Sequence, residues 1–270
     1  SIGGTSVTAG QDLFSVFEPA RGQHPARDTA TMPTLDDSFE AVHTAVLDRF
    51  GPPPTEFEGL DPFEAMVAVL LNRATGGMGS KAGLEDLGGD GLLTPEGLAK
   101  AEIPEIMDAI HGHGVSAPAR SVAPLRQLAR WLVDHHEARV DSLFDPHRSA
   151  DTLRGELAGL NGISVSGADA LILYALKKPS YPVDRATFRV LVRHDWLEPT
   201  ATYEEARDLI VDHALKEADL REGDAASLLA ELAHGMQQLG RRFCRTARPL
   251  CDGCPLESVL PEGGAREIDG

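Results

Sequence analysis

The feature that most constrains this chain is its apolar periodicity, which follows the α-helical repeat from Leu35 almost to the C-terminus. The segment DPFEAMVAVLLNRA, which starts at Asp61, has a good N-cap, then Pro62 in the first turn, and an apolar surface on nearly every side. A helix of that composition has to be buried in a core. No stretch alternates apolar and polar residues convincingly, as a half-buried β-strand would. The pattern predicts an all-α fold of about ten short helices with brief glycine and proline turns.

The length of 270 residues allows one large domain or two small ones. Residues 1–35 are rich in Gly, Ser, Thr, Pro and Ala without a sustained period, which predicts a flexible N-terminal tail. No apolar run reaches the roughly 18 residues of a membrane span, and the start does not resemble a signal peptide, so we expect no membrane partner. The three cysteines all lie in one C-terminal stretch, which predicts a reducing cytoplasm and a local metal site.

The formal net charge of −17 argues against a nucleic-acid partner, because phosphates favour a basic surface. The positive residues are unevenly placed, however, and an acidic protein can still carry one basic face. They gather in two groups, Arg185, Arg189 and Arg193, and then Arg241, Arg242, Arg245 and Arg248. On charge alone, a solvated acidic surface with scattered arginines is the favoured interpretation.

The most informative segment is LNGISVSGADALILYALKKPSYPVDRATFRVLVRH, residues 160–194. A helix runs into a tight turn at Gly162, a second helix begins near Ser166, and a further helix starts at Asp184 after a proline-containing loop. A glycine turn between two helices exposes backbone N–H groups, and the following helix adds its positive N-terminal end. Such a turn can bind a DNA phosphate without a charged side chain.

This segment resembles the helix–hairpin–helix, glycine/proline-rich loop and aspartate signature of the endonuclease III-like DNA glycosylases. The early helix at Asp61 resembles the early buried helix of that family, and His234 and Gly240 precede the first cysteine as in family members. Cys244, Cys251 and Cys254 have the C-x6-C-x2-C spacing of the family's iron–sulfur loop. The resemblance covers roughly residues 36–262, with three separate motifs in the family's order.

The resemblance implies a two-lobed helix–hairpin–helix glycosylase fold. Its helical barrel domain would span residues 55–178 and contain the hairpin. Its cysteine-loop domain would join residues 36–54 to residues 179–265. The expected partner is double-stranded DNA with a damaged or mismatched base, and the expected state is a monomer whose base-binding cleft lies between the lobes.

Asp184 is the carboxylate that the motif assigns to catalysis. Cleavage of an N-glycosidic bond builds positive charge on the sugar, which a carboxylate beside C1′ stabilises while it orients or deprotonates a water molecule. The target base must leave the stack and enter a pocket. An aspartate before a helix is more commonly an N-cap, and both roles can hold together.

The resemblance also implies a set of DNA contacts. Asn72 or Arg73, after the early helix, would fill the gap left by the flipped base, although a plain helix end with a glycine cap at Gly76 is the alternative. Tyr181 is the aromatic residue that we expect to face a base. The expected DNA-binding residues are Gly162, Ile163, Ser164, Ser166 and Gly167 of the hairpin, together with Asn72, Arg73, Arg185 and Arg242.

The sequence departs from the family in ways that bear on activity. Bifunctional members carry a lysine where this chain has Ser166, and Lys177 and Lys178 lie about 16–18 Å further along the helix. We therefore expect hydrolysis by water without a lyase step. Val69 stands where adenine-removing relatives use a glutamate, which argues against an adenine-mismatch specificity. The spelling GADALILYALKKP…PVD resembles most the branch that includes alkylated-purine glycosylases, so the substrate prediction is an alkylated purine, or else uracil or mismatched thymine. The alternative is a DNA-binding relative that has lost catalysis.

The cysteine loop has only three thiols, and Leu260 stands where a fourth would be expected. Iron–sulfur clusters are normally held by four thiolates. Three interpretations stay open: a [4Fe-4S] cluster with Glu257 or Glu262 as an oxygen ligand, a metal-free loop kept by packing, and a zinc ion with a further ligand.

Overall fold

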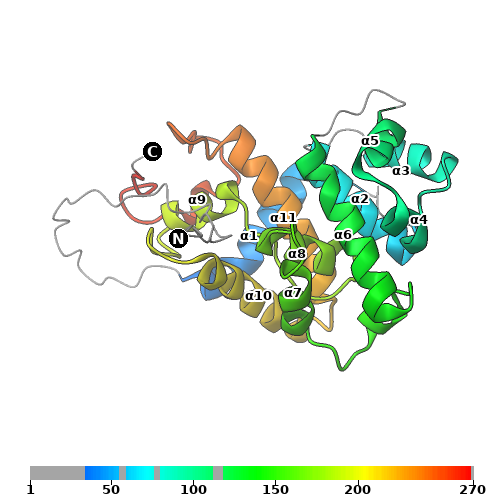
Figure 1. Ribbon diagram of the computed structural model, residues 1–270. Coiled ribbons are helices and arrows are strands. Elements are labelled where there is room, and N and C mark those ends of the chain that lie inside the picture. The colour runs from blue at the N-terminus through cyan, green and yellow to red at the C-terminus, as the bar shows by residue number, and fades with distance from the viewer. Residues whose placement is uncertain (1–33, 55–58, 76–79, 112–117, 269–270) are drawn as a thin grey trace, which may run out of the picture.

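The computed structural model describes residues 34–54, 59–75, 80–111 and 118–268 (Figure 1). Helices and no β-strands occur within these ranges, which confirms the all-α prediction. None of the described helices is long and apolar enough to cross a membrane. Residues 1–33, most of the expected tail, lie outside the described ranges, and α1 already begins at Leu35.

The elements follow one another as short helices with tight connections. In chain order they are α1 Leu35–Phe50, α2 Pro62–Thr75, α3 Ser80–Gly89, α4 Pro95–Lys100, α5 Ile103–Ile110, α6 Ala119–His136, the 3-10 turn η1 Asp141–Phe144, α7 Ala150–Ala158, α8 Val165–Ala170, the π-helical turn η2 Leu171–Ala175, α9 Arg185–Arg193, α10 Tyr203–Leu220, α11 Ala225–Arg242 and the 3-10 turn η3 Glu257–Val259.

The helix α2 lies within a first hydrophobic cluster, whose buried members fall between residues 63 and 176. Every residue from Ala65 to Leu71 is buried, as the all-round apolar pattern requires. Asp61 accepts the Glu64 N–H at 2.9 Å, and the Glu64 carboxylate accepts the Asp61 N–H at 3.2 Å, which caps the helix start. In Figure 1, α3 to α6 gather around α2 on the right of the molecule.

A second hydrophobic cluster is formed by α1, α9, α10 and α11, with members between residues 35 and 46 and between 173 and 256. The helix α11 packs against both α1 and α9. Close packing on α9 requires Gly240, because a Cβ there would lie 2.3 Å from the Cβ of Ala186. Side-chain volume at this one position would push the two helices apart.

The segment after the hairpin is shared by the two clusters. Ile172 belongs to the first cluster, Leu173 to the second, and Tyr174 packs against both. The helix α8 and the turn η2 therefore lie between the two cores. The two-domain division at residue 178 stays a prediction, and this shared segment is where its halves would join.

A buried carboxylate, Asp169 of α8, ties this shared segment to its surroundings. Its side chain has no solvent exposure. It accepts hydrogen bonds from the Ser180 hydroxyl at 2.7 Å and the Tyr203 hydroxyl at 2.5 Å. The guanidinium groups of Arg154 and Arg207 approach it at 3.3 and 3.2 Å. A buried charge is tolerated only when it is paired and hydrogen-bonded in this way, so these four partners form one unit with Asp169.

We expect Asp169→Ala to destabilise the protein by about 3–5 kcal/mol, because it leaves two partly buried arginines without their shared carboxylate. Urea unfolding monitored by circular dichroism measures this loss. Asp141→Ala is the matched control, since Asp141 pairs with Arg139 on the surface, and it should leave the unfolding midpoint unchanged. Equal midpoints for the two variants would contradict the role given to Asp169.

Candidate active site

Asp184 lies at the start of α9 and is half-buried. Its Oδ1 atom accepts the Thr187 N–H at 2.7 Å, so the carboxylate caps the helix. The other oxygen, Oδ2, has no hydrogen-bond partner in the described part of the chain. One oxygen is thus committed to the fold, while the second is available for chemistry, and the two roles considered for Asp184 are geometrically compatible.

The hairpin turn adopts the backbone geometry that the sequence indicates. Gly162 has φ +89°, a left-handed conformation that favours glycine, and a Cβ there would lie 3.1 Å from the Pro124 ring of α6. Ile163 is buried beneath the turn. The Ser164 hydroxyl accepts the Gly167 N–H at 3.1 Å and caps α8. Gly162 and Ser164 are exposed, so the turn presents its backbone to solvent.

Ser166 connects the hairpin to the segment that carries the candidate aspartate, Asp184. Its hydroxyl donates to the carbonyl of Val183, the residue before Asp184, at 3.3 Å. Arg73, at the end of α2, directs its Nη2 atom to the Ser166 hydroxyl at 3.5 Å. The fold therefore brings together the position of the family's missing lysine, the candidate carboxylate and a cation from a distant helix.

The negative charge of Asp184 affects the pKa of two nearby tyrosines. Burial, followed by the Asp184 carboxylate, raises the pKa of Tyr174 to about 12. The same two causes raise the pKa of Tyr181 well above its ordinary value. Tyr181 is completely buried, and its hydroxyl shares a 3.1 Å hydrogen bond with Thr187. The expectation that Tyr181 faces a base is therefore wrong, because the residue supports α9 from inside the core.

The other residues expected to contact DNA lie further out. Arg185 is exposed on the first turn of α9, and Asn72 is partly buried near the end of α2. Gly76, the alternative helix cap, lies outside the described residues. Arg242 is exposed at the end of α11, with its guanidinium 5.4 Å from the Phe50 ring centroid.

The structure places the arginines that the sequence groups together in two environments, some buried and some exposed. Arg189 and Arg193 are buried rather than on a basic face. Arg189 donates to the Cys244 carbonyl at 2.8 Å, and Arg193 donates to the carbonyls of Arg245 and Thr246 at 2.6 and 2.9 Å. These two side chains anchor the cysteine loop, residues 244–254, to α9. The arginines that stay exposed around it are Arg241, Arg242, Arg245 and Arg248.

The cysteine loop, as folded, does not fit a metal. No group of three His, Cys, Asp or Glu side chains among the described residues is arranged to hold an ion. The cavity that the three cysteines border has a volume of about 10 Å³, which is about the space that one water molecule needs. Glu257, a proposed fourth ligand, instead accepts the Gly253 N–H at 2.9 Å. The non-cysteine ligand that the sequence allowed is therefore unsupported.

The thiols also have local reasons to stay protonated. Burial is the main cause that raises the pKa of both Cys251 and Cys254. Cys244 is buried and accepts a long contact of 3.4 Å from Arg193. The described contacts that hold this loop to α9 are arginine hydrogen bonds to its carbonyl groups.

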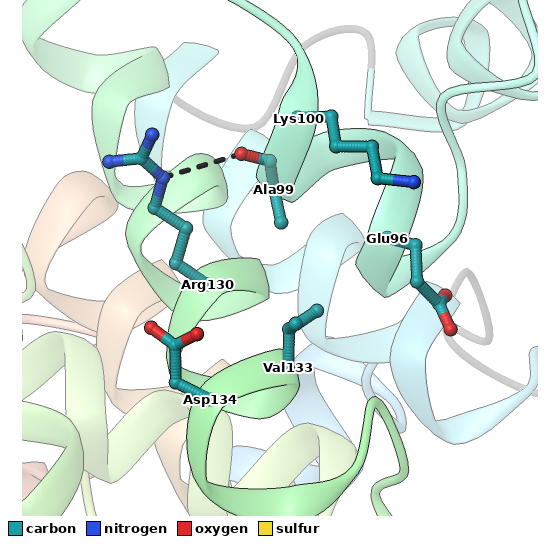
Figure 2. Close-up of a pocket in the computed structure, with 6 residues that line it drawn as sticks. All are labelled: Glu96, Ala99, Lys100, Arg130, Val133 and Asp134. Atoms are coloured by element: carbon teal, nitrogen blue, oxygen red, sulfur yellow. Dashed lines mark hydrogen bonds between the residues drawn. The ribbon is translucent and has the colours of Figure 1, made fainter.

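A surface hollow of about 370 Å³ lies elsewhere, between α4 and α6 (Figure 2). The Arg130 guanidinium crosses it and donates to the Ala99 carbonyl at 3.3 Å. Its lining contains both charge signs and none of the residues that the sequence assigns to a site: Glu96, Ala99, Lys100, Arg130, Val133 and Asp134. This hollow therefore does not coincide with the motif residues, which converge instead at the candidate site around Asp184.

Fold and site together define an all-α helix–hairpin–helix protein with a carboxylate beside the hairpin. No protein-family model matches the chain. The chain is 27% identical over 220 residues to endonuclease III of Thermotoga maritima, covering 82% of this chain and 91% of the relative. It is 22% identical over 196 residues to a putative DNA repair glycosylase of Methanocaldococcus jannaschii, covering 72% and 83%.

Solved structures of endonuclease III have the same fold. An endonuclease III structure from a non-covalent complex with DNA superposes with a TM-score of 0.60 at 20% identity, over 84% of this chain and 96% of that one. In sequence the chain is thus similar to endonuclease III and to a DNA repair glycosylase, and it has the helix–hairpin–helix fold of the endonuclease III structures.

We expect Arg193→Leu to destabilise the protein by about 2–4 kcal/mol, because the carbonyls of Arg245 and Thr246 lose a charged donor that is itself buried. Cys251→Ser should leave the melting temperature nearly unchanged, because the arginine hydrogen bonds rather than this thiol hold the loop. Thermal unfolding, with iron and zinc measured by elemental analysis, tests both variants. Stoichiometric metal in the purified protein, lost together with stability in Cys251→Ser, would overturn the arginine-anchored description of the loop.

Proposed function

We propose that this protein is a monofunctional DNA glycosylase of base-excision repair, which hydrolyses the N-glycosidic bond of a damaged or mismatched base. The observation that carries the proposal is the half-buried carboxylate of Asp184, with one oxygen unpaired among the described residues, beside a hairpin turn. Kinship with endonuclease III and with a putative DNA repair glycosylase supports the activity class.

The chemistry follows from the charge that develops at C1′. As the bond to the base breaks, its electron pair leaves with the base and the sugar becomes cationic. The Asp184 carboxylate stabilises that cation and accepts a proton from the water whose oxygen bonds to C1′. Capping by Oδ1 holds the side chain in one orientation, so Oδ2 can act without first being ordered.

The absence of a lyase step is supported by the side chains that could supply an amine. Ser166 occupies the position of the family's lysine and donates its hydroxyl proton to the Val183 carbonyl. The Lys178 ammonium is engaged elsewhere, because it donates to the carbonyls of Asp145 and Arg148 at 2.8 and 2.9 Å. Water is then the nucleophile, and the product is an abasic site.

The partner in this proposal is duplex DNA, bound by a monomer in the cytoplasm. The exposed backbone of the hairpin turn would contact a phosphate. Arg185 and the exposed arginines next to the cysteine loop would supply the positive surface that the net charge of −17 otherwise lacks.

Base release from duplexes with single lesions tests the proposal, with uracil, thymine opposite guanine, 3-methyladenine, 7-methylguanine, 8-oxoguanine and oxidised pyrimidines as the panel. We expect strand breaks only after alkali treatment. Asp184→Asn should lower the single-turnover rate by about 10²–10⁴-fold. The asparagine amide oxygen still caps α9, so the loss reports the missing charge rather than unfolding.

Asp224→Asn is the matched control, because Asp224 caps α11 in the same way through the N–H groups of Ala226 and Ser227. It should retain full activity. Breaks without alkali would indicate a lyase step. Salt-sensitive binding to an abasic duplex without release of any base would instead support a DNA-binding relative that has lost catalysis.

A further inference from the structure

Within the described part of the chain, Arg73 is a cation from a distant helix that contacts Ser166. It lies at the end of α2, and 93 residues separate it from Ser166, to whose hydroxyl it donates at 3.5 Å. Its Nε atom also lies 3.7 Å from where a Cβ on Gly167 would be. The guanidinium therefore rests against the first turn of α8, at the place of the family's lysine.

The charge of Arg73 is not neutralised by a direct partner. Within the described ranges, no carboxylate lies within salt-bridge distance of it, whereas other arginines such as Arg154 and Arg207 each hold more than one. Among the described residues its hydrogen bond is the long one to Ser166, which uses one of the five N–H donors of the guanidinium. The side chain stays open to solvent.

The surroundings of Arg73 nevertheless belong to the reaction site. Removal of water by neighbouring protein atoms lowers its pKa, while Tyr203, Tyr174, Asp169 and Asp184 act in the opposite direction. An arginine keeps its positive charge at neutral pH under these conditions. Arg73 and Asp184 carry opposite charges, and both lie close enough to the Tyr174 side chain to affect its pKa.

We propose that Arg73 contacts the extruded base and restricts the substrates to uncharged bases that carry a carbonyl acceptor, such as uracil or mismatched thymine. The inference rests on the proposed glycosylase function and narrows it. It assigns Arg73 to contact with the extruded base rather than to the gap that this base leaves in the DNA duplex. It also distinguishes between the substrates that the sequence left open.

The reason lies in the charge of the leaving group. When the C1′–N bond of a neutral pyrimidine breaks, the electron pair makes the departing base an anion, which later takes up a proton from solvent. Guanidinium N–H groups aimed at its carbonyl oxygen stabilise that anion as it forms. A purine methylated at N7 or N3 carries a formal positive charge and leaves as a neutral molecule. The cation of Arg73 repels it on entry and gives no help on departure.

Ser166 supports this role by position. Its hydroxyl accepts from Arg73 and donates to the Val183 carbonyl, so one short chain of hydrogen bonds relates the guanidinium to the residue before Asp184. A lysine at residue 166 would bring a second cation to the same place. Because Ser166 is small and uncharged, the guanidinium of Arg73 can lie beside it without steric or electrostatic repulsion.

Single-turnover base release from duplexes with uracil or 7-methylguanine tests the inference. The wild-type protein should release uracil faster than 7-methylguanine. Arg73→Ala should slow uracil release by about 10²-fold and leave 7-methylguanine release unchanged or faster. Arg73→Lys, which keeps the charge, should recover part of the loss. Arg139→Ala, which removes an exposed arginine paired with Asp141, is the matched control and should change neither rate.

Affinity for a duplex with a tetrahydrofuran abasic analogue separates base contact from gap filling. That duplex has no base at the site, so Arg73→Ala should bind it as tightly as the wild-type protein does. A parallel fall in both release rates with weaker binding to this duplex would assign Arg73 to the gap and overturn the inference. Wild-type release restricted to methylated purines would overturn it while the glycosylase proposal survives. No release of any base would overturn both this inference and the proposed glycosylase function.

Discussion

The buried carboxylate of Asp169 is the interaction on which the arrangement of the site depends. It has no solvent contact, so each of its oxygens has to be satisfied by protein donors. Those donors come from α7, from α10 and from the loop that leads to Asp184. Because they converge on α8, the hairpin helix is held against both hydrophobic clusters, and the loop before α9 has a defined path. The position of Asp184 relative to the hairpin follows from that path.

The chemistry proposed for the site is a consequence of the same geometry. A carboxylate that caps its own helix is rigid, and its free oxygen points to one place without a cost in side-chain order. Ser166 removes the amine that a lyase reaction needs, and it turns its hydroxyl toward the backbone beside Asp184. Arg73 then supplies the positive charge near that position. A lysine and an arginine are not equivalent there, because the guanidinium offers several fixed donors and forms no Schiff base.

The cysteine loop illustrates how one architecture can be held by different forces. Arg189 and Arg193 extend from α9 into the loop and bind its carbonyl groups. Their charged donors make stronger hydrogen bonds than neutral groups would. The loop therefore keeps a defined shape, and its neighbouring arginines remain exposed. Since Asp184 is the N-cap of α9, the same helix connects the candidate carboxylate to the exposed arginines beside the cysteine loop.

The sequence by itself determined the helices, the buried α2, the hairpin turn at Gly162 and the capping position of Asp184. These features depend on periodicity, caps and glycine conformations, which are properties of near neighbours in the chain. Only the tertiary structure decided that Tyr181 is buried, that Arg189 and Arg193 point inward, and that Arg73 reaches Ser166. Each of these depends on contacts between residues far apart in sequence, or on which face of α9 the second core covers. A charged side chain has no local signature that distinguishes a buried partner from a surface group, because its burial is set by the acceptors that the fold brings to it.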